Sequence, residues 1–334
     1  FSQRMLEMIA PNYLAPTPSM AIAEIQPDSS RGDLSKGFVV PRGTMMDSLA
    51  LKKTGVTCSY TTAHEVNLLP LKIDKVELGG VPADLPLTQL GLGQQGISSA
   101  LRIRIACDGP QNLGHLNFDR LEFFLSGPDI EALKLLELVM EHHAGIVCQT
   151  VSKQPQRQLL SSDALRQEGF DADQALLPYD LRNFDGYRLL QEYFAFPARF
   201  RFISLSGLSK LIQRCENEKA FDIFILLDKT DEQLERVVDA SHLALHCTPV
   251  INLFPKVAAR QKLSEGQHEY HLVVDNIRPL DYEIYAVKKI YASADGQRDD
   301  QTFRPFWSTW SGDAGNYGAY FSLRREQRVL SEHA

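Results

Sequence analysis

Aromatic residues concentrate in one stretch of the sequence, residues 169–208, which reads GFDADQALLPYDLRNFDGYRLLQEYFAFPARFRFISLSGL. Nine of the chain's 30 aromatic residues fall in these 40 positions. Burying one such ring stabilises a fold by roughly 1.5–3 kcal/mol, so a cluster of this density can hold neighbouring segments against it. We therefore expect this stretch, called the aromatic block below, to be a packing centre of the fold.

A helix is predicted in the middle of the aromatic block, with Asp185 as its N-cap and with Pro197 ending it. Its only polar strip is Arg188, Gln191 and Glu192, so we expect most of its circumference to be covered by its own chain. The predicted structural core of the block consists of Tyr179, Tyr187, Leu190, Tyr193, Phe194 and Phe196. If that is right, Phe194→Ala should cost about 3–5 kcal/mol of stability.

Composition and charge narrow the class of protein. With 334 residues, 44% hydrophobic and 23% charged, the chain has the composition of a globular protein of about two domains. A net charge of −7 and no basic cluster speak against a nucleic-acid surface. Five widely spread cysteines, no signal-like N-terminus and no apolar run of about 18 residues predict a cytosolic protein with reduced thiols and no membrane insertion.

Period-two alternation of apolar and polar residues predicts most of the secondary structure. Strands are expected at 20–25, 66–76, 99–107, 120–125, 146–151, 220–227, 270–274 and 282–290. The strands at 99–107 and 120–125 resemble an antiparallel pair, and a helix should follow Pro128 and end before Gly145. The predicted fold class is α+β, mostly antiparallel β with short helices in two packed subdomains.

A short polar segment, Gln154 to Gln158, is the best candidate for a domain boundary. The predicted organisation is the end of a helix and a proline-rich turn at 1–19, a β-rich α+β domain at 20–153, and a second α+β domain at 158–334 built around the aromatic block. In the first segment, Met5, Met8 and Ile9 share one face of a helix too short to be stable alone. This helix is therefore expected either to continue upstream or to dock on another surface.

No catalytic, cofactor or metal site is predicted. Gly91, Gly93 and Gly96 match the G-x-G-x-x-G pattern, but a strand follows them where a dinucleotide fold requires a helix, so a loop is favoured. The histidine pairs are His142 with His143, which point in different directions on a helix, and His242 with His246, which lack a third ligand. A metal-dependent hydrolase built on these two pairs and an acid remains the alternative function.

Two tryptophans, Trp307 and Trp310, stand in a loop-like stretch rich in Gly, Asp and Ser. Tryptophan in such a position stacks on a sugar, anchors a partner or packs back on its own domain. We therefore count both residues, together with Met5, Met8 and Ile9, as candidate interface residues.

Several longer motifs, in one order along nearly the whole chain, resemble the TssF family, also called VasA or ImpG, of type VI secretion baseplate subunits. The aromatic block contributes LLPYD, GYRLLQEYFAFP and F-x-F-I-x-L-x-GL. The motifs outside it are Tyr13-Leu14 with Pro16, Pro18 to Met20, Val40 to Thr44, Cys58 with Tyr60 and Thr62, Cys247 to Pro255, and Arg278-Pro279. Family members are longer at both ends, so the resemblance implies a central fragment.

The resemblance implies a structural role rather than an enzymatic one. TssF-like proteins form baseplate wedges, two copies of TssF with one of TssG, joined by TssK and TssE around a VgrG hub beneath the contractile sheath. Their fold is similar to that of wedge proteins of contractile phage tails. The implied partners are thus TssG, a second copy of TssF, TssK, TssE and the VgrG hub. The implied location is the cytoplasmic side of an apparatus docked at the inner membrane.

Overall fold

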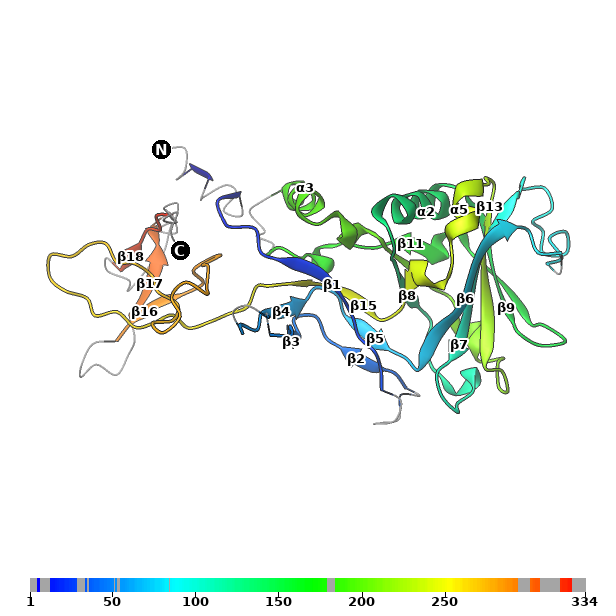
Figure 1. The fold of residues 1–334 in the computed structure, drawn as a ribbon, viewed down its shortest axis with the longest axis horizontal. Coiled ribbons are helices and arrows are strands. Elements are labelled where there is room, and N and C mark those ends of the chain that lie inside the picture. The colour runs from blue at the N-terminus through cyan, green and yellow to red at the C-terminus, as the bar shows by residue number, and fades with distance from the viewer. Residues whose placement is uncertain are drawn as a thin grey trace, which may run out of the picture. The chain divides into compact units, whose positions relative to one another are not determined.

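The computed structural model describes residues 5–6, 13–28, 34, 36–50, 52, 55–83, 85–178, 184–293, 301–306 and 319–325. The chain divides into two units (Figure 1). Unit 1 comprises Phe1–Thr17 and Pro255–Ala334, and unit 2 comprises Pro18–Phe254. Unit 2 therefore contains the aromatic block and most of the regular structure.

The secondary structure of unit 2 is mainly short strands. Its strands are β1 (Met20–Glu24), β2 (Phe38–Val40), β3 (Met45–Asp47), β4 (Ser59–Thr62), β5 (Val66–Leu68), β6 (Leu71–Gly80), β7 (Ser99–Cys107), β8 (Leu121–Leu125), β9 (His143–Thr150), β10 (Arg157–Leu160), β11 (Leu165–Gln167), β12 (Phe202–Leu205), β13 (Ala220–Leu227), β14 (Leu243–Ala244) and β15 (Cys247–Ile251). Its α-helices are α2 (Asp129–Glu141), α3 (Asp185–Ala195), α4 (Ser209–Ile212) and α5 (Glu232–Val237).

A five-stranded antiparallel sheet, in the order β10-β9-β13-β7-β6, is the sheet with the most strands in the described part of unit 2. Alternation along β13 separates two faces: Phe221, Ile223 and Ile225 belong to the main core, while Phe224 and Leu226 belong to a smaller cluster covered by the 81–98 segment. This segment contains the G-x-G-x-x-G glycines and forms turns, as predicted for a loop. The sheet is therefore apolar on both faces over part of its area.

Charged residues share the second face of this sheet with the smaller apolar cluster. Asp222 is buried and receives hydrogen bonds from Arg102 (2.6 Å) and Arg104 (2.7 Å) on the neighbouring strand β7. Burial alone would raise the pKa of Asp222, but the hydrogen bonds from Arg104 and Arg102 outweigh it and hold that pKa below its ordinary value. Asp222 is thus a structural ion-pair residue.

The main core lies where α2 contacts β8, β9, β11 and β13. The buried face of α2 consists of Ala132, Leu135, Leu138 and Val139. A second antiparallel sheet, β11-β12-β8-β14, contributes to the same core. The predicted pairing of 99–107 with 120–125 is wrong, because β7 lies between β13 and β6 whereas β8 lies between β12 and β14.

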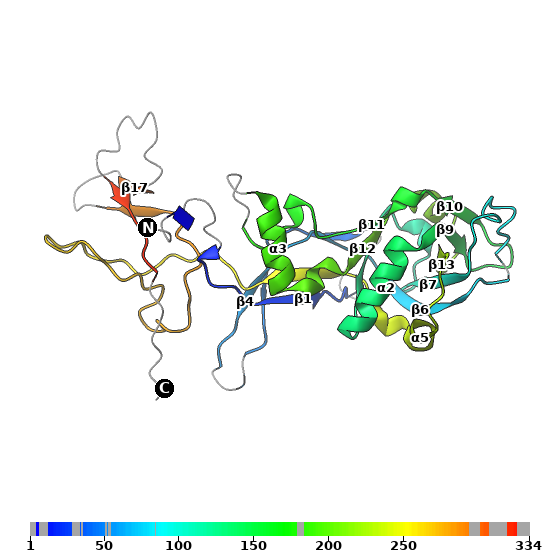
Figure 2. The same ribbon diagram turned by 90° about the horizontal axis from the view of Figure 1, so that it is seen from above.

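Two smaller sheets complete unit 2. One has the order β1-β15-β4-β3, and its β1–β15 ladder joins the two ends of unit 2 with Met20 opposite Ile251. The other pairs β2 with β5. Figures 1 and 2 show α3 at one end of unit 2, away from α2 and the five-stranded sheet.

The predicted domain boundary at 154–158 is wrong. Residues 154–156 lie between β9 and β10, and residues 157 and 158 belong to β10, which pairs antiparallel with β9 so that Arg157 lies opposite Gln149. The structure divides the chain instead after Phe254. A short polar stretch signals a hairpin turn as readily as a linker, and only the strand pairing distinguishes the two.

Within its described residues, unit 1 has three short strands and otherwise mostly irregular backbone. Its strands are β16 (Ile290–Ala292), β17 (Gln301–Pro305) and β18 (Tyr320–Phe321). β16 pairs antiparallel with β17, and β17 pairs parallel with β18. The strands predicted at 270–274 and 282–290 are wrong for all but the last residue: the described backbone there is irregular. Alternation predicts the pleat of a strand but not a partner for it.

All described pairs of strands except β17 with β18 run antiparallel, in agreement with the predicted, mostly antiparallel fold class. Among the residues that the structure describes, no helix combines the length and the hydrophobicity needed to cross a bilayer.

Candidate docking face on helix α3

Helix α3 spans eleven residues, Asp185–Ala195, within the aromatic block. Its end is set by Pro197, as predicted: the N–H of Phe196 closes the last turn on Glu192 O (2.8 Å), and a 3-10 helix, Pro197–Phe200, follows. Its start differs from the prediction, because Phe184 occupies the N-cap position and Asp185 is the first helical residue. The Asp185 carboxylate is thereby free to bind a side chain instead of capping the backbone.

The apolar face of α3 is exposed. Tyr187, Leu190, Tyr193 and Phe194 share one face, as predicted, but their exposed fractions range from 54% for Tyr193 to 81% for Phe194. The prediction that these four residues form a core covered by their own chain is therefore wrong. Phe196 is half-buried, and Tyr179 lies outside the described residues.

Neighbouring rings extend this surface. Phe184 packs edge-on against Tyr187 (5.7 Å between centroids), and Tyr193 contacts Phe194 (5.5 Å). The buried Phe200 ring links Tyr193 (6.0 Å) to the exposed Phe170 (5.3 Å). We call the resulting surface the α3 face; it consists of Phe170, Phe184, Tyr187, Leu190, Tyr193 and Phe194.

The buried side of α3 is ionic. Glu192 is fully buried, and Arg188, one turn earlier, is 5% exposed. Arg188 Nη1 donates to both Glu192 oxygens (3.2 and 3.1 Å), and its Nε donates to Asp185 Oδ1 (2.6 Å). This hydrogen bond from Arg188 is the main reason that the pKa of Asp185 lies below its ordinary value. The charged residues of the helix thus pair beneath it.

Glu192 also fixes the segment that precedes the helix. Its Oε1 accepts hydrogen bonds from the backbone N–H groups of Leu176 (3.1 Å) and Leu177 (2.9 Å), both of which are buried. Two backbone donors and two guanidinium groups then satisfy one carboxylate, because Arg199 contacts Glu192 as well. A buried charge is tolerated only when it is paired and hydrogen-bonded in this way.

Arg199 is the second buried cation of the cluster. Its Nη2 donates to the carbonyl oxygens of Gly169 (2.6 Å) and Gln174 (3.0 Å). Arg42 reaches the same segment from another part of the chain and donates to Ala175 O (2.5 Å). Burial, with repulsion from Arg188 and Arg42, lowers the pKa of Arg199 to about 9. Residues 169–177 are therefore held between two arginines and the Glu192 carboxylate.

This ionic cluster is not predicted from the sequence. The spacing of Asp185, Arg188 and Glu192 places all three on one side of a helix, opposite the aromatic residues. That pattern fixes the two faces but not which one is buried, and we assigned the usual apolar-in orientation. A fourth ionisable residue just beyond the helix, Arg199, is the signal that could have suggested the reverse.

The predicted histidine pairs do not converge on a common site. His142 Nδ1 contacts Asp228 Oδ1 (3.0 Å), whereas His143 Nδ1 contacts Met140 O (3.2 Å). His242 interacts with Asp239 and Glu131, and His246 Nε2 accepts a hydrogen bond from Leu69 N (3.3 Å). Within the described part of the chain, no group of three or more His, Cys, Asp or Glu side chains is placed to hold a metal ion.

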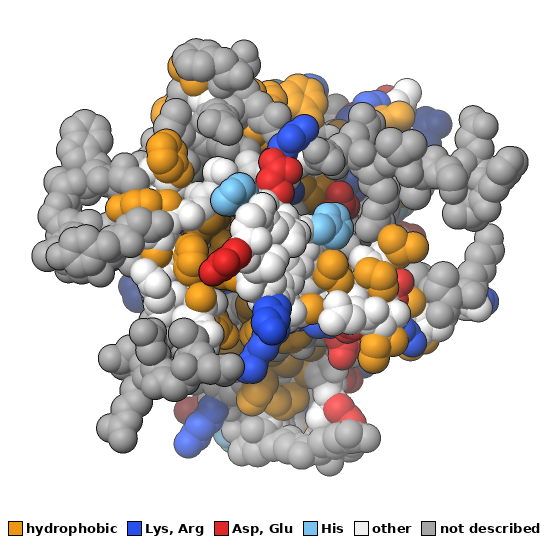
Figure 3. Space-filling model, turned by 90° about the vertical axis from the view of Figure 1, so that its left-hand side faces the viewer, with side chains coloured by type: hydrophobic (Ala, Val, Ile, Leu, Met, Phe, Trp, Pro, Cys, Tyr) orange, Lys and Arg blue, Asp and Glu red, His pale blue; other side chains and the backbone are white. Residues whose placement is uncertain are grey.

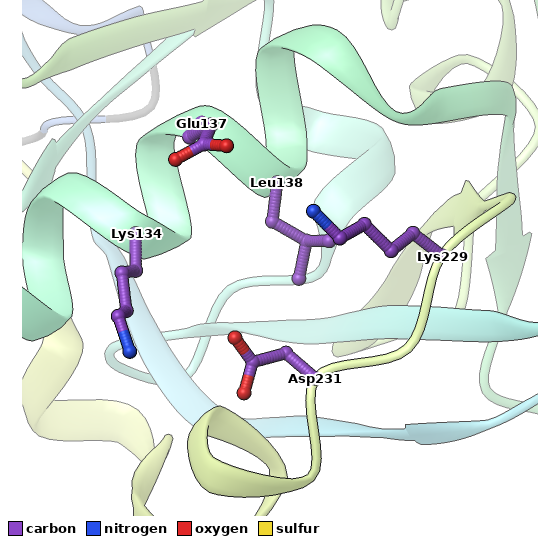
Figure 4. A pocket seen from close by; sticks show the side chains of 5 residues that line it. All are labelled: Lys134, Glu137, Leu138, Lys229 and Asp231. Atoms are coloured by element: carbon purple, nitrogen blue, oxygen red, sulfur yellow. The ribbon is translucent and has the colours of Figure 1, made fainter.

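A shallow pocket of about 220 Å³ lies between α2 and α5 (Figure 4). Figure 4 shows Lys134 and Leu138 extending from α2, and Lys229 and Asp231 from the segment between β13 and α5. Two lysines and two carboxylates, including Glu137, balance one another. Asp231 is also the N-cap of α5, accepting from Leu234 N (3.0 Å). The pocket therefore has no surplus charge to attract an ion.

The candidate interface residues from the sequence are only partly described. Met5 is exposed, with 42% of its surface accessible. Met8, Ile9, Trp307 and Trp310 lie outside the described residues. Unit 1 exposes further apolar side chains, among them Val257, Leu263, Ile277, Leu280, Tyr291 and Phe306. Figure 3 shows hydrophobic side chains exposed between ionisable ones on the face that it draws.

Comparisons with known proteins identify the family. The family model described as "Type VI secretion system, TssF" matches residues 1–334. The type VI secretion system component TssF1 of Pseudomonas aeruginosa PAO1 is 39% identical over 337 residues, covering 99% of this chain. The fold resembles, with a TM-score of 0.76 and 25% identity, a chain of a TssK-TssF-TssG baseplate subcomplex solved by cryo-electron microscopy, and this likeness covers 92% of the present chain.

The chain spans about half the length of these proteins, 53% of TssF1 and 54% of the chain in the subcomplex. Both the full-length family match and the relative of 39% identity agree with the motifs found in the sequence. The chain belongs to the TssF family of type VI secretion system proteins.

Proposed function

We propose that this chain is part of a structural subunit of the type VI secretion baseplate wedge. In this role it assembles with TssG, TssK, TssE and a second copy of TssF around the VgrG hub, and it supports sheath assembly and contraction. It acts on the cytoplasmic side of a secretion apparatus docked at the inner membrane. Its work is to make and rearrange interfaces, so no bond chemistry is required of it.

The observation that carries this proposal is the orientation of α3. An aromatic helix face that is exposed while the charges of the helix are buried is unfavourable in an isolated protein, because it leaves apolar surface in contact with water. It is useful in a protein whose neighbours cover that area. The solved baseplate subcomplex, in which a similar chain occurs with TssK and TssG, supports assembly with these two proteins.

The proposal is tested by deleting the tssF gene in the source bacterium and restoring it in trans. We expect deletion to abolish the fluorescent sheath structures of a tagged sheath protein, and we expect affinity-tagged TssF to co-purify TssG and TssK. A deletion strain that still assembles sheaths, or a tagged protein that captures neither partner, would contradict the proposal. Complementation with the intact gene is the control.

A further inference from the structure

We propose that the α3 face is the docking surface for a different baseplate subunit, one that presents an uncharged apolar patch edged by lysine or arginine. This inference rests on the proposed function, because it assigns a surface to one of the contacts that a wedge subunit makes. It goes further in naming the residues, the chemistry of the occupant and the part of unit 2 that holds them in place.

The area of the α3 face suits a specific interface. Its five aromatic residues are each 48–81% exposed, and Leu190 is 57% exposed. Since a buried aromatic residue removes roughly 150–250 Å² from water, covering the face would bury on the order of 600 Å² on this side. A stable complex buries about 800 Å² per partner. The α3 face alone thus supplies most of one side of such a contact.

The composition of the α3 face matches the centre of an interface rather than its edge. None of its six side chains carries a charge, and tyrosine and phenylalanine are enriched in interface cores while charged residues are depleted there. The charged residues of α3 itself, Asp185, Arg188 and Glu192, are occupied with one another. A partner can therefore cover the helix without having to desolvate an unpaired charge.

The α3 face is also held in position before any partner arrives. Glu192 ties the helix to Leu176 and Leu177, and Arg199 ties the same segment at Gly169. Phe170 follows Gly169 directly, and Arg188 Nη2 lies 3.5 Å from its carbonyl oxygen. A preorganised surface loses less conformational entropy on binding than a mobile one.

Charge at the edge of the α3 face distinguishes between occupants. The residues that follow Phe170 include two exposed acids, Asp171 and Asp173. A second copy of this chain, with a net charge of −7 and the same acids at the same edge, would be repelled there. A different subunit with lysine or arginine around an apolar patch would be attracted. The occupant is therefore assigned as a non-identical subunit.

The experiment measures binding of full-length TssF to purified TssG and, separately, to purified TssK, with Tyr187→Ser and Phe194→Ser as the test variants. Ile130→Ser is the matched control, because Ile130 is also a large apolar residue, 72% exposed, but lies on α2. Melting temperatures of all variants should equal that of the wild type. Binding to one of the two partners should weaken at least about 30-fold in the test variants and stay unchanged in the control.

A second measurement uses the acids. In the Asp171→Asn, Asp173→Asn double variant, association with the same partner should slow, and the salt dependence of the association rate should decrease. If all variants bind both partners as tightly as the wild-type protein does, the inference is overturned and the proposed function stays intact. Loss of self-association alone would overturn it in favour of a second copy. If the wild-type protein binds neither partner, the inference and the proposed function are overturned together.

Discussion

Glu192 and Phe194, two residues apart on α3, show the reverse of the burial that their chemistry suggests. The carboxylate is fully buried and the phenylalanine ring is 81% exposed. Stability should therefore depend on the charged residue. Removing one partner of a buried ion pair typically costs 3–5 kcal/mol because the other charge is left uncompensated.

At the residue scale we predict that Glu192→Ala destabilises unit 2 by about 3–5 kcal/mol, because Arg199 then lies buried without its carboxylate and Arg188 keeps only the carboxylate of Asp185. Phe194→Ala should change the free energy of unfolding by no more than about 0.5 kcal/mol, as expected of a surface substitution. Urea unfolding at neutral pH, followed by circular dichroism, measures both values.

This comparison contains its own control, since both substitutions remove a large side chain from the same helix. If Phe194→Ala proved as destabilising as Glu192→Ala, the helix would be buried on its aromatic side and the orientation described above would be incorrect. The original expectation of about 3–5 kcal/mol for Phe194→Ala would then hold.

At the scale of elements, the turn between β14 and β15 contains His246, whose backbone has a φ of 56°. Burial lowers the pKa of its imidazole to about 4, and Nε2 accepts a hydrogen bond from Leu69 N. The ring is therefore neutral in the folded state at pH 7. Because the pKa in the folded state lies below the unfolded value of about 6.5, stability is fully present above pH 6.5 and is lost as the pH falls towards 4.

We predict that His246→Asn removes about 2–3 kcal/mol of the loss in stability that wild-type protein shows between pH 7 and pH 4.5. Asparagine is chosen because it tolerates a positive φ better than most residues. Urea unfolding of both proteins at the two pH values gives the comparison. Identical pH dependence in the two proteins would show that His246 keeps its ordinary pKa when folded.

The sequence was a good guide to elements and a poor guide to their arrangement. The predicted strands at 99–107 and 220–227 match β7 and β13 residue for residue, because successive side chains of a pleated strand point to opposite faces and the sequence alternates accordingly. Their pairing with each other was not predicted, because it joins segments more than 100 residues apart. For α3, the pattern fixed two faces, but only the positions of Leu176, Leu177 and Arg199 in space determine which face is buried.

The same limit applies to the site. Four residues of the α3 face, Tyr187, Leu190, Tyr193 and Phe194, were predicted from the sequence to be core residues. That prediction is wrong because exposure depends on what the rest of the chain can cover. The alternation at 270–274 similarly predicts a strand, whereas the described backbone there forms no ladder: Ala259 N donates to Val273 O (2.9 Å) and the Gln261 side chain donates to His271 O. Local pattern is necessary for these features but does not suffice.

At the scale of the whole molecule, unit 2 is closed by pairing of its two ends. β1 at its start and β15 at its end lie side by side in one ladder. We predict that a fragment of residues 18–254 folds and unfolds cooperatively, because it keeps every sheet of unit 2 and the main core. A fragment of residues 20–153 lacks β13, the central strand of the five-stranded sheet, and should not fold.

Thermal unfolding followed by circular dichroism checks this prediction, with the complete chain as the reference. A cooperative transition for residues 20–153 would restore the boundary expected from the polar segment at 154–158. Failure of residues 18–254 to fold would indicate that unit 2 depends on unit 1.

The buried ionic cluster under α3 has a consequence for the timing of assembly. A subunit whose binding helix is stabilised by the partner must fold and associate in one step, and its supply is tied to that of the partner. Here the interactions that fix the helix belong to the subunit itself, so folding can be completed first and association can follow. In the proposed role, a cell can then keep finished subunits in reserve and assemble them whenever they are required.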